Sequence, residues 1–501
     1  MQTRHLALPV LLCLFNPNIQ AETCAIASMT DNLDITLPCL QIDSDVYSTG
    51  LELVSEWESD SLIWQWNEVL EETNCTPDPT RCTTLDDDWG LNISALDFNG
   101  LNLNAKLSYD TDLPEMSWRY VSHTVNQVMT MPVTSALDDA ALAKLRQYMN
   151  SVVGIDKQVP GAVLGVAQGS SILMTEAFGL SDVSTNTAMT TDNLLHIAST
   201  NKALTSFMLA ALVDEGVLQW NTRAQEIYPA FATADPQTSG NITIRQLLDM
   251  SSGLPEEGDL DTDEPARQLF EQLSKQTLVG KPGGQFKYSN LGVSLAGYLG
   301  VLAVAKKDHG QITEEDMNNL YSDYVALLKT KVLNPIGMKN SFVPRAEAVA
   351  TGRMAKSHIL QNGTFVVAKS KDVEQDNGAP SGGLKSTVGD MLRYIITDMQ
   401  QGVNPDGARV ASVTNVSERQ KLSPGPATDE KYGLGLEVIE NQNGLRYVGH
   451  TGSFDSFNSV MGFFPDKQIA FVLLTNGDGE AAEDLTENDF LATLADLLNT
   501  Q

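Results

Sequence analysis

A helical apolar pattern begins at His196-Ile197-Ala198-Ser199-Thr200-Asn201-Lys202. The apolar residues that follow are spaced by three and four positions, and a glycine ends the pattern: Leu204, Phe207, Met208, Ala211, Leu212 and Gly216. This spacing predicts an amphipathic helix with Ser199 near its N-terminus. Because residues three positions apart share one face of a helix, Lys202 is expected beside the Ser199 hydroxyl.

Ser199 and Lys202 together have the chemistry of an activated nucleophile. A serine hydroxyl is a weak nucleophile until a base takes its proton, and a desolvated lysine, whose pKa is lowered, can be that base. The N-terminus of a helix also favours the negative charge that develops during attack. A Ser-x-x-Lys spacing nevertheless arises about once by chance in a chain of this size. Its structural alternative is a helix cap followed by a solvated lysine.

Two further segments strengthen the catalytic interpretation. The glycine-rich loop 282–292 contains Tyr288-Ser289-Asn290 and runs into an expected helix, whereas 448–453 contains His450-Thr451-Gly452. Taken alone, the first is an ordinary turn with a helix cap and the second a strand end with a surface histidine. The three motifs occur in order, with Tyr288 placed 89 residues after Ser199 (288 − 199) and His450 162 residues after Tyr288 (450 − 288).

With these motifs in order, the chain resembles the serine β-lactamase and penicillin-binding superfamily. It is most similar to the branch of class C β-lactamases, D-alanyl-D-alanine carboxypeptidases, D-specific peptidases and related esterases. Four secondary matches support this: Ile242-Thr243-Ile244-Arg245-Gln246-Leu247-Leu248, Ser252-Gly253-Leu254-Pro255, Asn334-Pro335-Ile336-Gly337-Met338 and Ser381-Gly382-Gly383-Leu384-Lys385-Ser386-Thr387. The resemblance covers roughly residues 135–499 and leaves the N-terminal block outside.

The resemblance implies a catalytic role for each of three residues. Ser199 would attack a carbonyl and form an acyl-enzyme, which water would then hydrolyse. Lys202 and Tyr288 would share the proton, and either of them could be the base. The expected activity is hydrolysis of D-amino-acid peptides, as in a D-alanyl-D-alanine carboxypeptidase, or of small esters. A class C-like β-lactamase is the alternative within the same superfamily.

The resemblance also implies substrate-binding roles. Asn290 would orient the substrate amide or the lysine, and His450 would hold the leaving group, or a substrate carboxylate if the imidazole is protonated. Thr451 and Gly452 belong to the same wall. The backbone N–H groups of Ser199 and Ser453 would form the oxyanion hole.

Three positions depart from the pattern of the family. His450 stands where β-lactamases usually carry lysine, which favours the peptidase and esterase members. Met250 stands where relatives often have histidine, and Ser456 occupies a position that is often glycine. The last two are expected to affect the shape of the substrate site more than the chemistry.

Strands are expected at both ends of the catalytic region. Segments 161–167 and 172–174 flank a turn, as do 459–464 and 469–474, and each pair predicts a β-hairpin. The residues between the two pairs have mostly helical patterns, including an expected buried helix at 291–305. We therefore predict an α+β fold, an α/β sandwich, in which one antiparallel sheet is built from both ends around a large helical insertion. A helix is also expected over 136–150.

An export signal is expected over residues 1–21. A short basic region precedes the apolar run 6–15, and Ala21 offers a small residue for cleavage. Because an apolar run of ten residues is too short for a hydrocarbon core of about 30 Å, no stable membrane span is expected. A lipoprotein signal with Cys13 lipidated is the alternative, although bulky residues precede that cysteine. The mature protein is expected to be periplasmic or secreted.

The remaining cysteines predict a disulfide-held domain. Four follow the signal, at Cys24, Cys39, Cys75 and Cys82. An even number in an exported chain indicates two disulfides, and we expect the sequential pairing because it closes the shortest loops. Their spacing fits no zinc pattern. Short apolar alternations between polar turns favour a small β-rich domain over residues 22–125, followed by the hydrolase domain over 126–501.

The N-terminal block is unusually acidic and rich in tryptophan. The whole chain has a net charge of −32, which makes a nucleic-acid partner a poor expectation. Residues 22–130 hold 20 Asp+Glu and 3 Lys+Arg, a net charge of −17. This block also contains five of the six tryptophans, Trp57, Trp64, Trp66, Trp89 and Trp118. They predict a small core or, alternatively, a glycan- or peptidoglycan-binding surface.

Other hydrolase designs fit less well. The sequence contains no Gly-x-Ser-x-Gly and no His-Glu-x-x-His motif. The acyl-enzyme mechanism needs neither a metal nor a cofactor, and none is expected. The expected partner is a small-molecule or peptide substrate, with peptidoglycan contact as a further possibility.

Overall fold

The computed structural model describes residues 137–256, 264–369, 376–423 and 432–500, together with the backbone of nine strands between residues 28 and 128. The chain divides into two compact units, Met1–Val133 and Thr134–Gln501. The expected export signal and the expected disulfide pairing lie outside the described residues, as do the side chains of the five N-terminal tryptophans.

The N-terminal unit contains a nine-stranded sheet. Its strands are β1 Ser28–Met29, β2 Ile35–Ile42, β3 Asp45–Val54, β4 Ile63–Trp66, β5 Glu71–Glu72, β6 Thr83–Leu85, β7 Leu91–Phe98, β8 Leu101–Tyr109 and β9 Ser117–Val128. Because β2 pairs with β3 on one side and with β6 on the other, the sheet closes on itself. Leu91 and Ile93 of β7 are buried, as is Leu107, which faces Leu91 across the β7–β8 pair.

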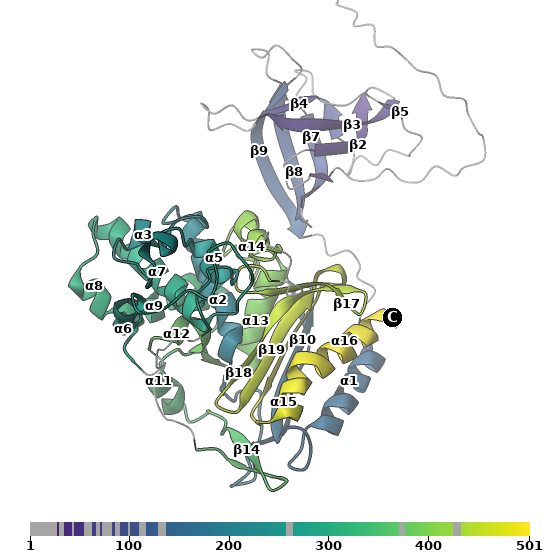
Figure 1. Ribbon diagram of the computed structural model, residues 1–501. Helices are drawn as coiled ribbons and strands as arrows, with labels where there is room; N and C mark the ends of the chain where they lie inside the picture. The colour runs from purple at the N-terminus through teal and green to yellow at the C-terminus, as the bar shows by residue number, and fades with distance from the viewer. Residues whose placement is uncertain are drawn as a thin grey trace, which may run out of the picture. The chain divides into compact units, whose positions relative to one another are not determined.

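The second unit is organised around an antiparallel sheet, drawn in Figure 1 with strands from both ends of this region side by side. Its order is β12-β11-β10-β20-β19-β18-β17. The bounds are β10 Gly161–Gln168, β11 Ser171–Asp182, β12 Thr187–Ala188, β17 Glu437–Gln442, β18 Leu445–Phe454, β19 Phe457–Phe464 and β20 Ile469–Thr475. β10 lies directly beside β20, with Val163 opposite Leu474. The prediction of one antiparallel sheet built from both ends is confirmed.

One face of this sheet is covered by terminal helices (Figure 1). These are α1 Asp139–Val152, α15 Glu480–Asp484 and α16 Phe490–Asn499, with the π-helical turn η4 Leu485–Asp489 between the last two. Leu145 and Met149 of α1 and Leu494 of α16 share one buried cluster with Leu164 and Phe471 of the sheet. α1 matches the predicted helix at 136–150, and its N-cap Asp138 accepts a hydrogen bond from the Ala141 N–H at 2.7 Å.

The helical insertion packs on the other face. Its three long helices are α2 Asn201–Asp214, α7 Asn290–His309 and α13 Val388–Met399. The shorter helices are α3 Ala224–Ile227, α4 Pro236–Ser239, α5 Ile244–Leu248, α6 Ala266–Leu273, α8 Glu314–Asn318, α9 Leu320–Leu328, η2 Lys329–Leu333, α10 Asn334–Ile336, α11 Arg345–Ala350, α12 Ala379–Gly382 and α14 Val413–Arg419. The short strands β13 Leu195–His196 and β16 Lys385–Ser386 pair with each other, as do β14 His358–Gln361 and β15 Thr364–Val367.

Glycines allow the central helices to approach closely. A Cβ on Gly300 of α7 would lie 2.7 Å from Leu209 of α2, and a Cβ on Gly297 would lie 2.5 Å from Pro380 of α12. α7 is buried from Leu291 to Ala303, which confirms the predicted buried helix at 291–305.

The predicted amphipathic character of α2 is wrong. Every residue from Asn201 to Leu212 is buried, so this helix has no solvent face along most of its length. The predicted polar face turns inward because its side chains find partners in distant segments. Asn201 Nδ2 donates to the Ala379 carbonyl at 2.8 Å, and Thr205 Oγ1 donates to the Pro380 carbonyl at 2.6 Å.

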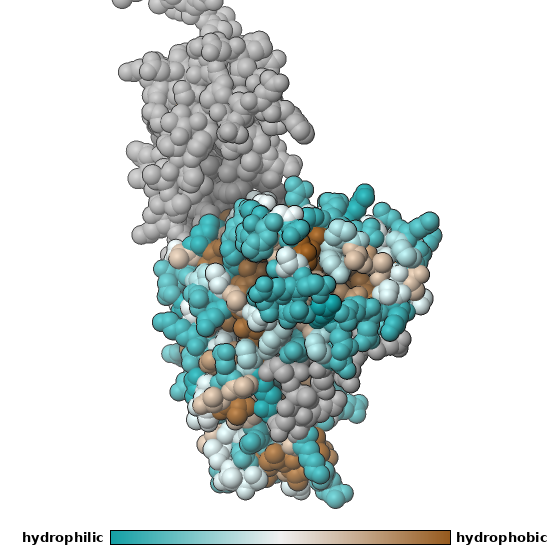
Figure 2. Space-filling model, turned by 90° about the vertical axis from the view of Figure 1, so that its left-hand side faces the viewer, coloured by the Kyte–Doolittle hydropathy of each residue, from teal (hydrophilic) through white to brown (hydrophobic). Residues whose placement is uncertain are grey.

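The surface drawn in Figure 2 is mainly hydrophilic over the second unit, with apolar patches scattered across it. Large exposed apolar side chains in the described residues include Ile172 and Leu360. No helix among the described residues has the length and apolar character needed to cross a bilayer.

Candidate active site

Ser199 lies in a tight turn at the entrance to α2. The turn is the 3-10 helix η1 Ala198–Thr200, which connects β13 directly to α2. Ala198 has a φ of +50°, a left-handed conformation that side chains rarely adopt. Its N–H donates to His196 Nδ1 at 3.1 Å, and Thr200 Oγ1 donates to the Ile197 carbonyl at 2.6 Å. These bonds hold the strained turn, as is common where a reactive group must be presented.

Lys202 lies beside Ser199, as the spacing predicted. Its Nζ is 2.7 Å from Ser199 Oγ and 3.1 Å from the Ser381 carbonyl oxygen. The lysine is fully buried, whereas Ser199 is partly exposed. The solvated-lysine alternative is therefore wrong. The basic nitrogen is aimed at the hydroxyl and held there from a second direction by α12.

Tyr288 faces Lys202 from the loop that precedes α7. Lys202 Nζ lies 4.8 Å from the centroid of the Tyr288 ring. The next residue, Ser289, is the N-cap of α7, and its Oγ accepts a hydrogen bond from the Gly292 N–H at 2.9 Å. Asn290 is the first residue of α7 and is partly exposed. The Tyr-x-Asn motif thus spans a helix start beside the Ser–Lys pair.

Met250, one of the three departures, supports this loop. Its φ is +64°, and its carbonyl accepts a hydrogen bond from the Lys287 N–H at 2.7 Å. Its Sδ lies 3.3 Å from the Ser289 nitrogen. Met250 therefore contacts the residues on both sides of Tyr288. Ser456 has a φ of +65°, in the turn between β18 and β19, which explains why glycine suits that position.

The third motif lies on β18, directly against the nucleophile turn. A Cβ on Gly452 would lie 2.7 Å from the Ser199 nitrogen and 2.9 Å from the Ile197 carbonyl oxygen, so no larger residue fits without a backbone shift. Ser459 of β19 ties the same turn to the sheet, because its Oγ donates to the Ile197 carbonyl at 2.7 Å. This contact brings the backbone of Ser199 next to the strand that carries Ser453.

His450 lies within β18 and is 1% exposed, so the surface-histidine alternative is wrong. Its Nδ1 is 2.5 Å from the Thr451 carbonyl oxygen, and its Nε2 is 2.7 Å from the Tyr432 hydroxyl. A carbonyl can only accept, so Nδ1 carries the proton and Nε2 accepts from Tyr432. Burial and the neighbouring Lys202 lower the pKa of His450 to about 3. The imidazole is therefore neutral at neutral pH, and offers no positive charge to a substrate carboxylate.

Glu437 is a site residue that the sequence interpretation missed. This glutamate begins β17, and its Oε1 lies 3.4 Å from the Thr451 nitrogen, 3.3 Å from Thr451 Oγ1 and 3.9 Å from His450 Nδ1. Its side chain keeps 27% of its surface exposed. Burial raises the pKa of the Glu437 carboxyl to about 7. A titratable carboxylate therefore stands beside the third motif.

A sequence signal for Glu437 was present. Asn443-Gly444 is a strong hairpin-turn dipeptide, and both residues have positive φ values of +49° and +89°. Counting outward along the two strands from that turn places Glu437 near His450 and Thr451. Tyr432, the partner of His450, left no comparable signal because it precedes β17 outside any regular pattern.

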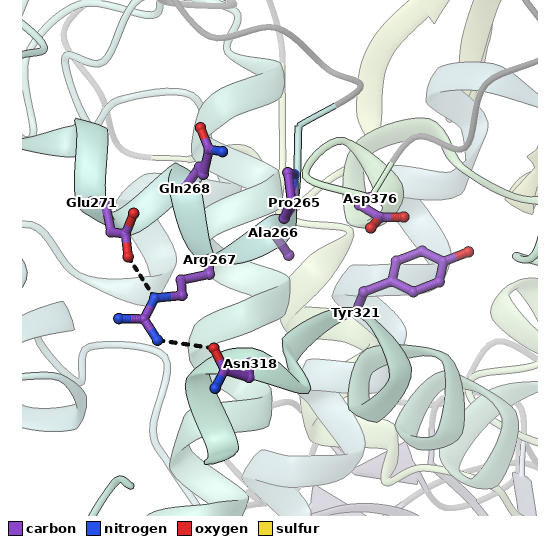
Figure 3. Close-up of a pocket in the computed structure, with 8 residues that line it drawn as sticks. All are labelled: Pro265, Ala266, Arg267, Gln268, Glu271, Asn318, Tyr321 and Asp376. Carbon is purple, nitrogen blue, oxygen red and sulfur yellow. Dashed lines mark hydrogen bonds and ion pairs between the residues drawn. The ribbon is translucent and has the colours of Figure 1, made fainter. Parts of the chain in front are cut away.

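A separate cavity of about 340 Å³ lies among α6, α8 and α9. Figure 3 shows its lining: Pro265, Ala266, Arg267, Gln268, Glu271, Asn318, Tyr321 and Asp376. None of the eight predicted site residues is among them. Arg267 is paired there with Glu271 at 2.5 Å and donates to Asn318 at 2.9 Å. Among the described residues, no group of three or more His, Cys, Asp or Glu is arranged to hold a metal ion.

Comparisons with known proteins identify a family for residues 139–496. The family model named Beta-lactamase matches residues 139–496. Penicillin-binding protein 4 of Amycolatopsis lactamdurans is 27% identical over 333 residues, which cover 64% of this chain and 82% of that protein. Protein flp of Staphylococcus aureus strain MW2 is 24% identical over 353 residues, which cover 68% of this chain and 65% of that protein.

A solved structure shares the fold. The octameric penicillin-binding protein homologue from Pyrococcus abyssi aligns with a TM-score of 0.56 and 22% identity, covering 72% of this chain and 77% of that one.

Proposed function

Because the chain belongs to the β-lactamase family, we propose that it is a serine hydrolase that forms an acyl-enzyme on Ser199 and acts on small esters or D-amino-acid peptides. The observation that carries the proposal is the distance of 2.7 Å between the buried Lys202 Nζ and Ser199 Oγ. A hydroxyl next to a buried basic nitrogen, at the start of a helix, is arranged for nucleophilic attack.

The proposed reaction has two steps. In the first, Ser199 Oγ bonds to the substrate carbonyl carbon while its proton passes to Lys202 or Tyr288. The bond to the leaving group then breaks, and the leaving group takes that proton. In the second step, water attacks the acyl-enzyme and frees the acid and the serine.

An oxyanion hole formed by the backbone N–H groups of Ser199 and Ser453 is part of the proposal. The close approach of Gly452 to the Ser199 nitrogen supports it, because the neighbouring Ser453 N–H then lies on the strand beside the nucleophile. Loss of one such donor typically lowers the rate by about 10²–10³. Asn290 is assigned to orienting the substrate amide or Lys202.

The third motif supports the ester and peptide assignment over a β-lactamase. β-Lactamases usually carry lysine where this chain has His450, and His450 is buried and neutral. The alternatives are a class C-like β-lactamase and a protein acylated by penicillin without turnover, in line with the name of the Amycolatopsis relative. Fast turnover of a chromogenic cephalosporin would favour the first alternative, and a long-lived penicillin adduct the second.

A nucleophile substitution tests the assignment. We expect Ser199→Ala to abolish hydrolysis of p-nitrophenyl acetate above the level of buffer. Ser184→Ala, which removes an exposed hydroxyl hydrogen-bonded to Asp182, is the matched control and is expected to keep full activity. If Ser199→Ala hydrolysed the ester as fast as the wild type, the assignment would fail.

Export and the accessory role of the N-terminal region complete the proposal. The export signal over residues 1–21 and a separate N-terminal domain over 22–125 are supported by the sequence pattern, and the division of the chain near residue 133 is compatible with the latter. N-terminal sequencing of the protein recovered from a periplasmic or culture fraction should begin at Glu22. Retention of residues 1–21 would contradict the signal.

A further inference from the structure

We infer that Glu437 sets the charge that the site accepts on the leaving group, so that neutral or cationic leaving groups are favoured and a leaving group with a carboxylate is repelled. The inference rests on the proposed acyl-enzyme at Ser199 and specifies the substrate class of that same site. It depends on the position of Glu437, on the free edge of β18 and on the charges of the other site residues.

The carboxylate of Glu437 accepts hydrogen bonds from both polar donors of Thr451. Its Oε1 accepts from the Thr451 N–H at 3.4 Å and from the Thr451 hydroxyl at 3.3 Å. These two donors belong to the motif expected to hold the leaving group. An anionic leaving group would therefore meet a second carboxylate where it would need hydrogen-bond donors.

The position of Glu437 relative to the reacting carbonyl follows from the edge of β18. The pairing of β17 with β18 begins at Glu437 and Gly449, so residues 450–454 extend past the end of β17. Alternate N–H groups of a strand point to the same side, so the N–H groups of Thr451 and Ser453 point to one edge, ~7 Å apart. The carboxylate of Glu437 thus lies one dipeptide repeat from the proposed oxyanion donor, within reach of a leaving group.

Among the described residues, the ion pair of Glu437 is with His450 and not with a lysine or arginine. Among the eight site residues Lys202 is the basic one, and its Nζ already contacts Ser199 Oγ and the Ser381 carbonyl. His450 is neutral, with both ring nitrogens engaged. The carboxylate on the leaving-group side therefore has no lysine or arginine partner among the described residues.

The repulsion should depend on pH because the Glu437 carboxyl, with a pKa of about 7, gains its charge between pH 6 and 8.5. The titratable groups that face it are His450 and Tyr447 on β18, Tyr432 before β17 and Glu487 on η4. Burial raises the pKa of both tyrosines well above 10.0, so they stay neutral in this range. Glu487, whose pKa is also raised by burial, adds to the negative field at high pH.

A matched pair of aryl acetates tests the inference: the acetyl esters of 4-hydroxybenzoate and of 4-hydroxybenzamide. The two differ in the charge of the leaving group, and the benzoate is ionised throughout pH 6–8.5. For the wild type, we divide kcat/KM for the benzamide ester by kcat/KM for the benzoate ester. We expect this ratio to rise about tenfold from pH 6 to pH 8.5. A rise of this size corresponds to the repulsion of like charges ~7 Å apart at an effective dielectric constant of ~20–40. For the cationic 4-(trimethylammonio)phenyl acetate, kcat/KM relative to the neutral benzamide ester should instead increase from pH 6 to pH 8.5, because Glu437 then attracts the leaving group.

Two variants separate charge from structure. Glu437→Gln keeps an acceptor for Thr451 but cannot ionise, so its ratio should stay flat with pH. Glu440→Gln makes the same change of charge on an exposed residue of β17, which is 3.4 Å from Arg446, and should keep the wild-type rise. Glu437→Asp, which keeps the charge, should keep part of the rise.

The outcomes distinguish this inference from the proposed function. Loss of all ester cleavage in Ser199→Ala supports the proposed function. The inference about Glu437 is then decided by how the kcat/KM ratio of the two esters changes with pH. A wild-type ratio that does not change with pH, or the same rise in Glu437→Gln as in the wild type, would overturn the inference. Cleavage that persists in Ser199→Ala, or none in the wild type, would count against the proposed function itself.

Discussion

Lys202 Nζ lies 2.7 Å from Ser199 Oγ, and a second contact of 3.1 Å to the Ser381 carbonyl holds the lysine in that position. The two residues come from one helix start, whereas Ser381 comes from α12, which lies about 180 residues further along the chain (381 − 199 = 182). The pair therefore depends on the packing of α12 against α2 as well as on helix geometry.

Replacement of the lysine should stop the chemistry while the fold persists. Lys202→Met keeps a similar volume in a buried position but removes the basic nitrogen, so we expect kcat for p-nitrophenyl acetate to fall by about 10²–10⁴. Circular dichroism and a thermal melt check that the protein remains folded. Lys339→Met, at an exposed position, is the control and should leave kcat unchanged. Activity of Lys202→Met close to that of the wild type would show that Lys202 is not involved.

Gly452 should be intolerant of a side chain. A methyl group there would press on the Ser199 nitrogen at 2.7 Å, so Gly452→Ala should displace the nucleophile turn from β18 and lower kcat by at least about 10² through the oxyanion hole. Gly389→Ala is the control, because a Cβ at that position of α13 meets nothing within 4 Å. It should leave kcat unchanged and raise stability slightly, since alanine suits a helix better by up to about 1 kcal/mol. Equal activity of the two variants would contradict the contact.

The buried ion pair beneath α2 should be costly to break. Arg419 Nη1 lies 3.0 Å from Asp398 Oδ1, both side chains are fully buried, and Arg419 also donates to the Ala203 carbonyl at 2.8 Å. Arg419→Met would leave Asp398 uncompensated and should lower the free energy of unfolding by about 3–5 kcal/mol in urea titrations. Arg223→Met removes the exposed partner of Glu226 and should cost about 0–1 kcal/mol. Equal losses would show that burial of the first pair is unimportant.

His450 should make the protein less stable in acid. Its pKa falls from 6.5 in the unfolded chain to about 3 in the folded one, so the unfolded state binds the proton more readily between these values. This contribution to stability is present above pH 6.5 and is lost as the pH falls towards 3, and at pH 4.5 the loss is about 2–3 kcal/mol. Glu437, whose pKa is raised, acts with the opposite sign between pH 4.5 and about 7.

A comparison of variants isolates the histidine. Urea unfolding of the wild type and of His450→Gln at pH 8 and pH 4.5 should show a smaller acid loss in the variant, because glutamine can accept from Tyr432 but does not titrate. Both proteins keep Glu437, so its contribution cancels in the difference. The same acid loss in both would contradict a depressed pKa for His450.

Much of the fold followed from patterns that are local in the sequence. Both hairpins, the helix at α1 and the buried helix α7 are marked by turns, alternation or apolar runs. The burial of α2 on all sides was not predictable in this way. Its polar residues satisfy their hydrogen bonds with segments that are distant in sequence, as when Ser206 Oγ accepts from Arg419 Nε at 2.9 Å.

The candidate site likewise has one part that the sequence predicts and another that it does not. Ser199 and Lys202 could be placed together from helix periodicity, and the order of the three motifs indicated which loops would join them. The neutral state of His450 could not be predicted, because it depends on burial and on Tyr432, a residue outside any motif. Glu437, which stands opposite Gly449, was missed because no catalytic motif marks it, although the Asn443-Gly444 turn signalled the register between β17 and β18.

The central claim is that Ser199 is the nucleophile and that Lys202 activates it. Treatment of the full-length protein with a fluorophosphonate, followed by intact mass and peptide mapping, tests this most directly because a phosphonylated serine does not turn over. We predict a single adduct in the wild type, on the tryptic peptide that ends at Lys202, and no adduct in Ser199→Ala. In Lys202→Met, which lacks that cleavage site, intact mass should show that the adduct forms much more slowly. An adduct on another residue, or equal labelling of Ser199→Ala, would contradict the account.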